Sequence, residues 1–318
     1  MATAIQQAGT KAAQTGLPKE EFADKMLGTA NAAGLALMIS IGHRTGLFDA
    51  MAGMPPATSR EIAEASGLNE RYVREWLGAM VTGQVVIYDP PRDTYLLPPE
   101  HAALLTRAAS PENLAVTMQF FPVLGRVEDE IVERFRNGGG VPYSAYHRFH
   151  EVMAEDSGQT VVATLLDKIL PLVPGGLAML KRGADVLDVG CGRGRALITM
   201  AAAFPNSRFT GYDLCDDAIG AATEDAARRG LNNVTFRALD ASEVDEPERY
   251  DLLTAFDAVH DQRDPARVLE NIHNARRPGG VRLMQDIAAS RHWEKNSEHP
   301  LGSLLYAISC MHCMSVSL

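Results

Sequence analysis

The sequence is poor in basic residues, and this deficit limits the partners it can have. Its 318 residues include 30 Lys and Arg against 40 Asp and Glu, a formal net charge of −10. Nucleic acids and anionic membrane surfaces attract proteins that carry an excess of positive charge. We therefore expect neither a nucleic-acid nor a membrane partner, and small-molecule chemistry is favoured.

Cysteine is also scarce. Cys191, Cys215, Cys310 and Cys313 are too few and too scattered for a disulfide framework in a chain of this size. The last two form a Cys-x-x-Cys pair, but no further ligands follow at a spacing typical of zinc sites, and no thioredoxin-like strand precedes it. We expect no metal and interpret these thiols as buried on a helix.

Long hydrophobic runs are missing as well. The longest apolar stretch, residues 32–41, is shorter than the roughly 20 residues of a membrane span. The first residues lack the basic and apolar regions of a secretory signal, so we expect a cytoplasmic protein. A hydrophobic content of 46% predicts a sizeable core, and the length predicts two domains.

The most informative stretch of the chain is glycine-rich. An apolar run reaches Asp188, and glycines follow at 190, 192 and 194. Dinucleotide sites require glycine at the first, third and sixth positions, but the sixth position here is Arg195. The spacing indicates a nucleoside cofactor that carries no pyrophosphate, and the alternative is an ordinary glycine-rich turn between a strand and a helix.

Three further predicted strands also end at an acid. Asp213, Asp240 and Asp257 close strands at 208–213, 234–239 and 250–256. Ligands of open α/β sheets bind outside the carboxyl ends of the strands. Asp213 lies 19 residues after Gly194, near the roughly 20-residue offset at which an acid meets ribose hydroxyls. We therefore predict that Asp213 binds a ribose.

The N-terminal part predicts a winged-helix unit. Residues 1–28 have little pattern and suggest a flexible arm, and residues 30–51 suggest a helix pair interrupted at Gly42 and Gly46. Within the domain at 29–110, helix signals are followed by a hairpin over 85–97. The helix signals are a start at 58–61 and an apolar stripe of Val73, Trp76, Leu77 and Met80.

A winged helix could read DNA, but its charge argues otherwise. Residues 55–107 contain five basic and seven acidic residues. In the second helix, Arg71 and Arg74 are matched by Glu70 and Glu75, so the basic footprint of a DNA reader is absent. We favour a role in dimerisation and substrate covering, and a transcription regulator that senses a ligand remains the alternative.

Residues 111–180 form a helical linker in this interpretation. A long helix is predicted over 111–135, a break over 137–140 and another helix over 161–172. Several aromatic or apolar residues of this region either pack the domains together or wall an apolar acceptor pocket. The candidates are Phe121, Tyr143, Tyr146, Phe149 and Met153.

These features together carry a family resemblance. The winged unit, the linker and the glycine loop resemble two-domain class I S-adenosylmethionine (SAM)-dependent methyltransferases, including small-molecule O-methyltransferases. Longer sequence motifs, at residues 256–262, 277–280, 284–286 and 311–314, resemble those of a mycobacterial family of winged-helix-containing methyltransferases. The resemblance implies an α/β, Rossmann-like sheet in residues 181–318. The last two strands of such a sheet are expected to be missing after residue 287.

The resemblance also implies a cofactor site. SAM would be the methyl donor and S-adenosylhomocysteine the product, with Asp240 and Ala241 at the adenine edge. A fold relative that retains SAM for another reaction stays an alternative. The implied cofactor residues are Asp188, Gly190, Cys191, Gly192, Gly194, Asp213, Leu214, Asp240, Ala241, Phe256 and Asp257.

His260 and Asp261 are the catalytic candidates. They follow the fourth strand, where plant-type O-methyltransferases carry His-Asp-Trp, but Gln262 replaces the tryptophan here. His260 would deprotonate a hydroxyl and Asp261 would orient its ring, or His260 holds the loop by hydrogen bonds. His312 joins the substrate candidates, and a homodimer through the N-terminal domain is expected. The sequence identifies neither the acceptor nor the methylated atom.

Overall fold

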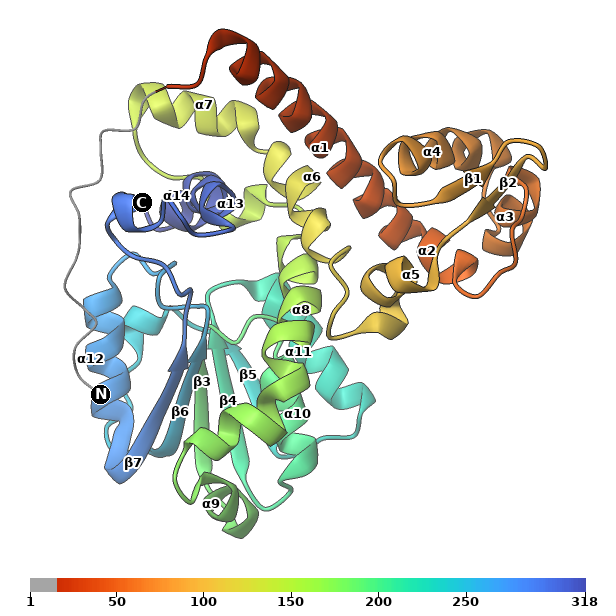
Figure 1. Cartoon of the computed structure of the whole chain (residues 1–318). Coiled ribbons are helices and arrows are strands. Elements are labelled where there is room, and N and C mark those ends of the chain that lie inside the picture. The colour runs from red at the N-terminus through yellow and green to blue at the C-terminus, as the bar shows by residue number, and fades with distance from the viewer. Residues whose placement is uncertain (1–15) are drawn as a thin grey trace, which may run out of the picture.

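A computed structural model describes residues 16–318 (Figure 1). The first helix, α1, spans Lys19–Thr45, with Glu20 and Glu21 in its first turn, where acids favour a helix start. The prediction of a flexible arm over residues 1–28 is therefore wrong for residues 19–28. Its remaining part up to residue 15 lies outside the described residues.

Helix α1 runs through Gly42 and ends at Gly46, after which α2 spans Leu47–Met51. The predicted interruption at Gly42 is wrong for a packing reason. A Cβ built on Gly42 would lie 2.6 Å from a ring carbon of Trp76 and 2.8 Å from one of Phe48. Glycine at this position lets two aromatic rings pack against the helix backbone without breaking the helix.

The predicted winged-helix unit is confirmed. Helix α3, Ser59–Ser66, begins with a capping box between Thr58 and Glu61, and α4, Glu70–Thr82, is capped by Asn69. The predicted stripe of α4 is fully buried. Strands β1, Ile87–Asp89, and β2, Thr94–Leu96, pair antiparallel, and α5, Pro99–Leu105, follows.

The linker differs from the long helix predicted over residues 111–135. Only α6, Phe120–Gly125, and α7, Glu128–Asn137, are α-helical there. Gly125 has low helix propensity, and the acids of residues 128–130 favour a new helix start, so the chain breaks between them. Helix α8, Phe149–Thr160, then continues through irregular helical turns to Leu172, and α9 spans Gly176–Arg182.

The C-terminal half is a five-stranded parallel sheet in the order β5-β4-β3-β6-β7, which confirms the predicted Rossmann-like α/β class. Alternate residues of β3 face opposite layers: Val186 packs on the side of α10 and Leu187 on the side of α12. The strands are β3 (Asp185–Val189), β4 (Arg208–Asp213), β5 (Val234–Ala238), β6 (Tyr250–Phe256) and β7 (Arg276–Gln285). The main helices are α10 (Arg195–Ala203), α11 (Asp216–Arg228) and α12 (Pro265–Ala275).

The segment after β7 is helical, and within residues 16–318 no strand follows Gln285. Helices α13, Gly302–Ile308, and α14, Met314–Val316, flank a π-helical turn and lie beyond the carboxyl ends of the strands (Figure 1). The Tyr146 hydroxyl donates to the Met311 carbonyl at 2.6 Å. This contact ties the segment to the linker.

Helix α1 is long and apolar enough to cross a membrane by length and composition, although the longest apolar run in the sequence is short. Only 22% of its most apolar window is buried. A bent pair, Phe149–Leu172 with Gly176–Arg182, passes the same test among the described residues. Core helices of soluble proteins have these properties too, so length and composition do not decide the location.

Gly42→Ala should destabilise the winged-helix unit. The added methyl group overlaps Trp76 and Phe48, and overpacking of this kind costs about 1–3 kcal/mol. Gly34→Ala in the same helix is the control, because its Cβ meets nothing within 4 Å and should add about 0.4–1 kcal/mol. Urea unfolding followed by tryptophan fluorescence measures both, and equal stability of the two variants would contradict the packing argument.

Candidate functional site

A cavity of about 1380 Å³ opens at the carboxyl edge of the sheet. It exceeds the roughly 300–1,000 Å³ of a typical single-ligand pocket and has room for a cofactor and a second molecule. Four predicted residues are not in its wall: Gly194, Phe121, His260 and His312. The predicted residues that line it are Asp188, Gly190, Cys191, Gly192, Asp213, Leu214, Asp240, Ala241, Phe256, Asp257, Asp261, Tyr143, Tyr146, Phe149 and Met153.

The glycine loop passes very close to its neighbours. Gly190 has a φ of +69°, and a Cβ there would overlap the Cβ of Ala258. At Gly194 a Cβ would lie 2.5 Å from the ring of Phe236, which explains why this residue supports the loop from behind and is absent from the wall. Only glycine fits these two positions, because a side chain at either would collide with a neighbouring residue of the protein.

Asp213 is held in a fixed orientation at the end of β4. Its Oδ2 accepts the backbone N–H of Gly192 at 2.8 Å, and its Oδ1 accepts that of Cys215 at 3.0 Å. Each carboxylate oxygen has a second lone pair for a ligand. The arrangement suits the binding of a vicinal diol, such as the hydroxyls of a ribose.

Asp188 lies fully inside the protein behind the loop. The hydroxyl of Thr254 donates to its Oδ1 at 2.6 Å. Burial raises the pKa of Asp188 to about 7 and the charge of Asp213 adds to this, while the bond from Thr254 acts in the opposite direction. The raised pKa lets Asp188 hold a proton up to about neutral pH, which limits its repulsion with Asp213.

The two remaining strand-end acids stand on either side of the cavity. Asp240 accepts the backbone N–H of Ser242 at 2.8 Å. Asp257 has a φ of +52°, which is strained for a residue with a Cβ, and the side-chain amide of Gln285 donates to it at 3.2 Å. Burial raises the pKa of Asp257. Strain of this kind persists where the surrounding structure fixes the side chain.

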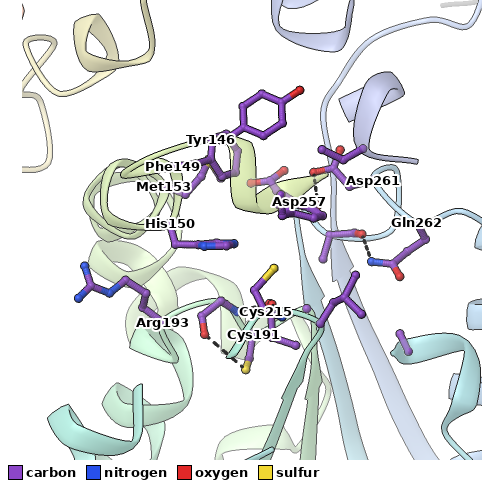
Figure 2. A pocket seen from close by; sticks show the side chains of 18 of the residues that line it. Tyr146, Phe149, His150, Met153, Cys191, Arg193, Cys215, Asp257, Asp261 and Gln262 are labelled. Atoms are coloured by element: carbon purple, nitrogen blue, oxygen red, sulfur yellow. Dashed lines mark hydrogen bonds between the residues drawn. The ribbon is translucent and has the colours of Figure 1, made fainter. Parts of the chain in front are cut away.

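Helix α8 covers the cavity. In Figure 2, Phe149, His150 and Met153 project from it toward Asp257 and Asp261 on the opposite wall. His150 stacks on Tyr143 with the ring centroids 5.7 Å apart, and its Nδ1 lies 3.2 Å from an oxygen of Asp217. The cover is thus tied to the start of α11.

Sequence reasoning missed part of this wall. Neither His150 nor Gln262 was predicted to line the cavity, and Arg193 and Cys215, in the loops that follow β3 and β4, were not predicted either. The position of Arg193 and Cys215 in strand-end loops is a signal that could have found them. The contribution of His150 depends on how α8 folds over the sheet.

His312 lies under the aromatic cover. It is completely buried and stacks on Phe149, with the ring centroids 3.7 Å apart. Neither ring nitrogen has a hydrogen-bond partner among the described residues. Burial lowers the pKa of His312 to about 4, so its ring is neutral. The structure places this substrate candidate behind the cavity wall.

His260 lies between two carboxylates. Its Nδ1 is 2.6 Å from Oδ1 of Asp286, and its Nε2 is 3.1 Å from Oδ1 of Asp261. Asp261, together with the Cys313 thiol, raises the pKa of His260 to about 11 despite partial burial. An imidazolium has no free lone pair, so this arrangement does not favour His260 as a base. Its catalytic role, like that of Asp261, stays a prediction.

The second helix of the winged unit has paired charges. Arg71 forms an ion pair with Glu75, and Nε of Arg74 lies 3.5 Å from Glu70. Both arginines of this helix therefore have an acidic partner one turn away. This arrangement matches the absence of a basic footprint in the sequence.

Two family models match the chain, one in its N-terminal part and one in its C-terminal part. Residues 33–107 match the Rv2258c-like winged HTH domain, and residues 180–314 match a methyltransferase domain. The chain joins a winged-helix domain to a methyltransferase domain. The parallel sheet, its glycine loop and its strand-end acids lie in the second match.

Curated relatives match about a third of the chain. A ubiquinone biosynthesis O-methyltransferase of Leptothrix cholodnii is 33% identical over 107 residues, which cover 33% of this chain and 45% of that protein. Methyltransferase ungE' of Aspergillus campestris is 37% identical over 106 residues, or 31% of each chain. The matched region spans less than half of either relative.

Solved structures match nearly the whole chain. Human N-acetylserotonin methyltransferase in complex with SAM has a TM-score of 0.66 at 16% identity, covering 94% of this chain and 88% of its own. The mitomycin 7-O-methyltransferase MmcR has a TM-score of 0.65 at 22% identity, covering 92% and 85%. At these identities the likeness shows the fold.

Asp188→Asn should stabilise the cofactor-free protein at neutral pH. The folded state binds the Asp188 proton more tightly than the unfolded chain, so the unsubstituted protein loses stability as the pH rises from about 4 to about 7. The asparagine side chain cannot ionise, so the variant does not lose this stability as the pH rises. Its advantage should grow over that interval to about 4 kcal/mol and stay constant above pH 7.

Urea unfolding at pH 5, 6, 7 and 8 measures this difference. Asp185→Asn, at the other end of β3, is the control. Although burial opposes it, Arg208 and Arg277 hold the pKa of Asp185 below its usual range, so its neutralisation should destabilise the protein throughout. An Asp188→Asn effect that does not change with pH would contradict the assigned shift.

Proposed function

We propose that this protein is a SAM-dependent methyltransferase that methylates a small molecule, most simply on oxygen. One observation carries the proposal: Asp213 is fixed by two backbone N–H groups beside an exposed glycine loop, inside a methyltransferase domain. The names of the O-methyltransferase relatives and neighbours support the same reaction.

The residues present fit SAM. A Cβ on Gly192, in the cavity wall, would meet nothing within 4 Å, so a nucleoside can approach the loop backbone closely there. Asp213 would hold the ribose hydroxyls, and Asp240 with Ala241 would meet the adenine edge. Asp257 and Asp188 would lie toward the amino acid end. Bound SAM supplies a methyl group on a sulfonium, which needs no further activation.

The protein's own contribution is to position the acceptor and exclude water. Phe149 and Met153 form an apolar wall opposite Asp257 and Asp261 (Figure 2), and Tyr143 also lines the cavity. Alignment of an acceptor atom behind a transferable group accounts for much of the rate gain in such reactions. We propose that the linker, residues 111–180, covers the acceptor, which is apolar or aromatic.

Asp213→Ala should abolish most of the SAM affinity. Removing a charged hydrogen-bond partner costs about 1.5–3 kcal/mol, or roughly 10- to 150-fold in the dissociation constant. Calorimetric titration with SAM and with S-adenosylhomocysteine measures it. Glu224→Gln is the control because Glu224 is an exposed acid on α11 outside the cavity wall, and its affinity should equal that of the unsubstituted protein.

Methyl transfer is then tested with labelled SAM and a panel of phenols, quinols and alcohols. Label in an acceptor, lost in Asp213→Ala and kept in Glu224→Gln, supports the proposed reaction. Saturable SAM binding without transfer to any extracted metabolite would favour a regulator that senses SAM. Absence of binding to the folded protein would overturn the cofactor assignment.

We further propose a homodimer through α1 and a cytoplasmic location. Apolar side chains stand exposed along the first half of α1: Phe22 is 52%, Met26 49% and Leu27 66% exposed. A second copy of this helix would bury them. All four cysteines are free in the described structure, which suits a reducing compartment.

A double variant, Phe22→Asp with Leu27→Asp, should dissociate the dimer. The molar mass measured by light scattering after gel filtration should fall from that of two chains to that of one, because two charges buried at the interface oppose association. Phe135→Asp on α7 is the control, since Phe135 is 77% exposed but lies outside α1. Flotation of the unsubstituted protein with lipid vesicles, or a monomer at every concentration, would contradict the dimer.

A further inference from the structure

Three potential metal ligands converge beside the cavity, where Asp261 forms part of its wall. The ligand atoms of His260, Asp261 and Cys313 all lie within 4.8 Å of one another. The first two follow β6, and the third belongs to the C-terminal helical segment. The cluster therefore exists only because this segment folds back over the carboxyl edge of the sheet (Figure 1).

The cluster contains unsatisfied polar atoms. Oδ1 of Asp261 is buried and has no hydrogen-bond partner among the described residues, although the charge of His260 Nε2 is 3.1 Å away. Both nitrogens of the adjacent His312 also lack a hydrogen bond among the described residues, and Nδ1 lies 3.8 Å from Oδ2 of Asp261. Buried donors and acceptors are paired in the great majority of cases, so this concentration of unpaired atoms requires a cause.

Asp286 supplies the outer support that metal-bound histidines commonly have. Its Oδ1 is 2.6 Å from Nδ1 of His260, so the opposite nitrogen, Nε2, is directed toward Asp261 and Cys313. A carboxylate on the far nitrogen fixes the ring and increases the basicity of the ligand nitrogen. The remaining Asp261 oxygen, Oδ2, lies 3.4 Å from the hydroxyl of Tyr143, which donates to it.

We propose that His260, Asp261 and Cys313 bind one divalent transition-metal ion of the zinc class. Imidazole, carboxylate and thiolate together select such an ion over Mg²⁺ or Ca²⁺, which prefer oxygen alone. Binding replaces the proton on Nε2 and the thiol proton, and both pass to the buffer. Three protein ligands leave a fourth position for water or another small ligand.

A second triplet, His150, Cys215 and Asp217, also meets the distance criterion. It is the weaker candidate because Asp217 is 77% exposed and its contact with His150 already uses Nδ1 of that ring. Among its ligand atoms none is buried without a partner. It provides an internal comparison for the experiment.

The spacing of these residues along the sequence did not predict this site. Cys313 is part of the Cys-x-x-Cys pair, but Cys310 is not in the cluster, and the other two ligands come from a different segment. The prediction that the chain holds no metal rested on local spacing alone. Tertiary contact brings the ligands together here.

The test is Zn²⁺ titration of the chelator-treated full-length chain, followed by calorimetry and by competition with a zinc indicator. We expect one ion per chain and at least 100-fold weaker binding in Cys313→Ser and in His260→Ala. The matched controls, Cys310→Ser and His292→Ala, should bind as the unsubstituted protein does. With Co²⁺ in place of Zn²⁺, a thiolate-to-cobalt charge-transfer band should appear in the unsubstituted chain and in Cys310→Ser, and Cys313→Ser should lack it even at saturating Co²⁺.

Asp286→Asn keeps all three ligands and should weaken the metal 10- to 100-fold, the usual effect of losing an outer-shell partner. It keeps the proposal testable if Cys313→Ser does not fold by circular dichroism. Lack of saturable binding to the folded, unsubstituted chain would overturn the proposal. So would binding that survives Cys313→Ser or that is lost in Cys215→Ser. These readouts need neither SAM nor an acceptor, so they are independent of methyl transfer.

Discussion

The close approach of the glycine loop to its neighbours is the constraint on which the site depends. Gly190 abuts Ala258, from the loop after β6, and Gly194 abuts Phe236 of β5. The loop is thereby fixed between the two halves of the sheet, and its N–H at Gly192 reaches the carboxylate of Asp213. A side chain at either glycine would move this N–H. The orientation of the acid at the end of β4 is therefore a consequence of packing behind the loop.

Four acids at one edge of a sheet create a repulsion that the protein limits by unequal solvation. Burial raises the pKa of Asp188 to about 7, whereas Asp213 lies at the cavity surface and accepts two backbone N–H groups. Burial also raises the pKa of Asp257. A neutral diol and a cationic sulfonium can be held at the same edge because the acids differ in burial and in hydrogen bonding.

Short-range signals in the sequence predicted the parts of the fold that short-range physics decides. The capping box at Thr58 and the stripe of α4 stand as predicted, and β4 and β6 have their predicted bounds. The long linker helix failed because its apolar spacing continues across Gly125, where the chain turns to fit between α1 and α8. Strand-end acids were predictable since parallel strands bring their ends together. The cover residues were not, because their position depends on how the linker meets the sheet.

The acceptor end of the cavity is built by tertiary contact between the linker and the C-terminal segment. Phe149 of α8 stacks on His312, and Tyr146 donates to the Met311 carbonyl. The buried imidazole gains dispersion from the rings that surround it but loses the hydrogen bonds of both nitrogens. Such a cost persists where the neighbouring groups have a function, and here those neighbours are Asp261 and Cys313. The selectivity of this end therefore depends on how two segments pack over the sheet, and a local motif at the glycine loop carries no information about it.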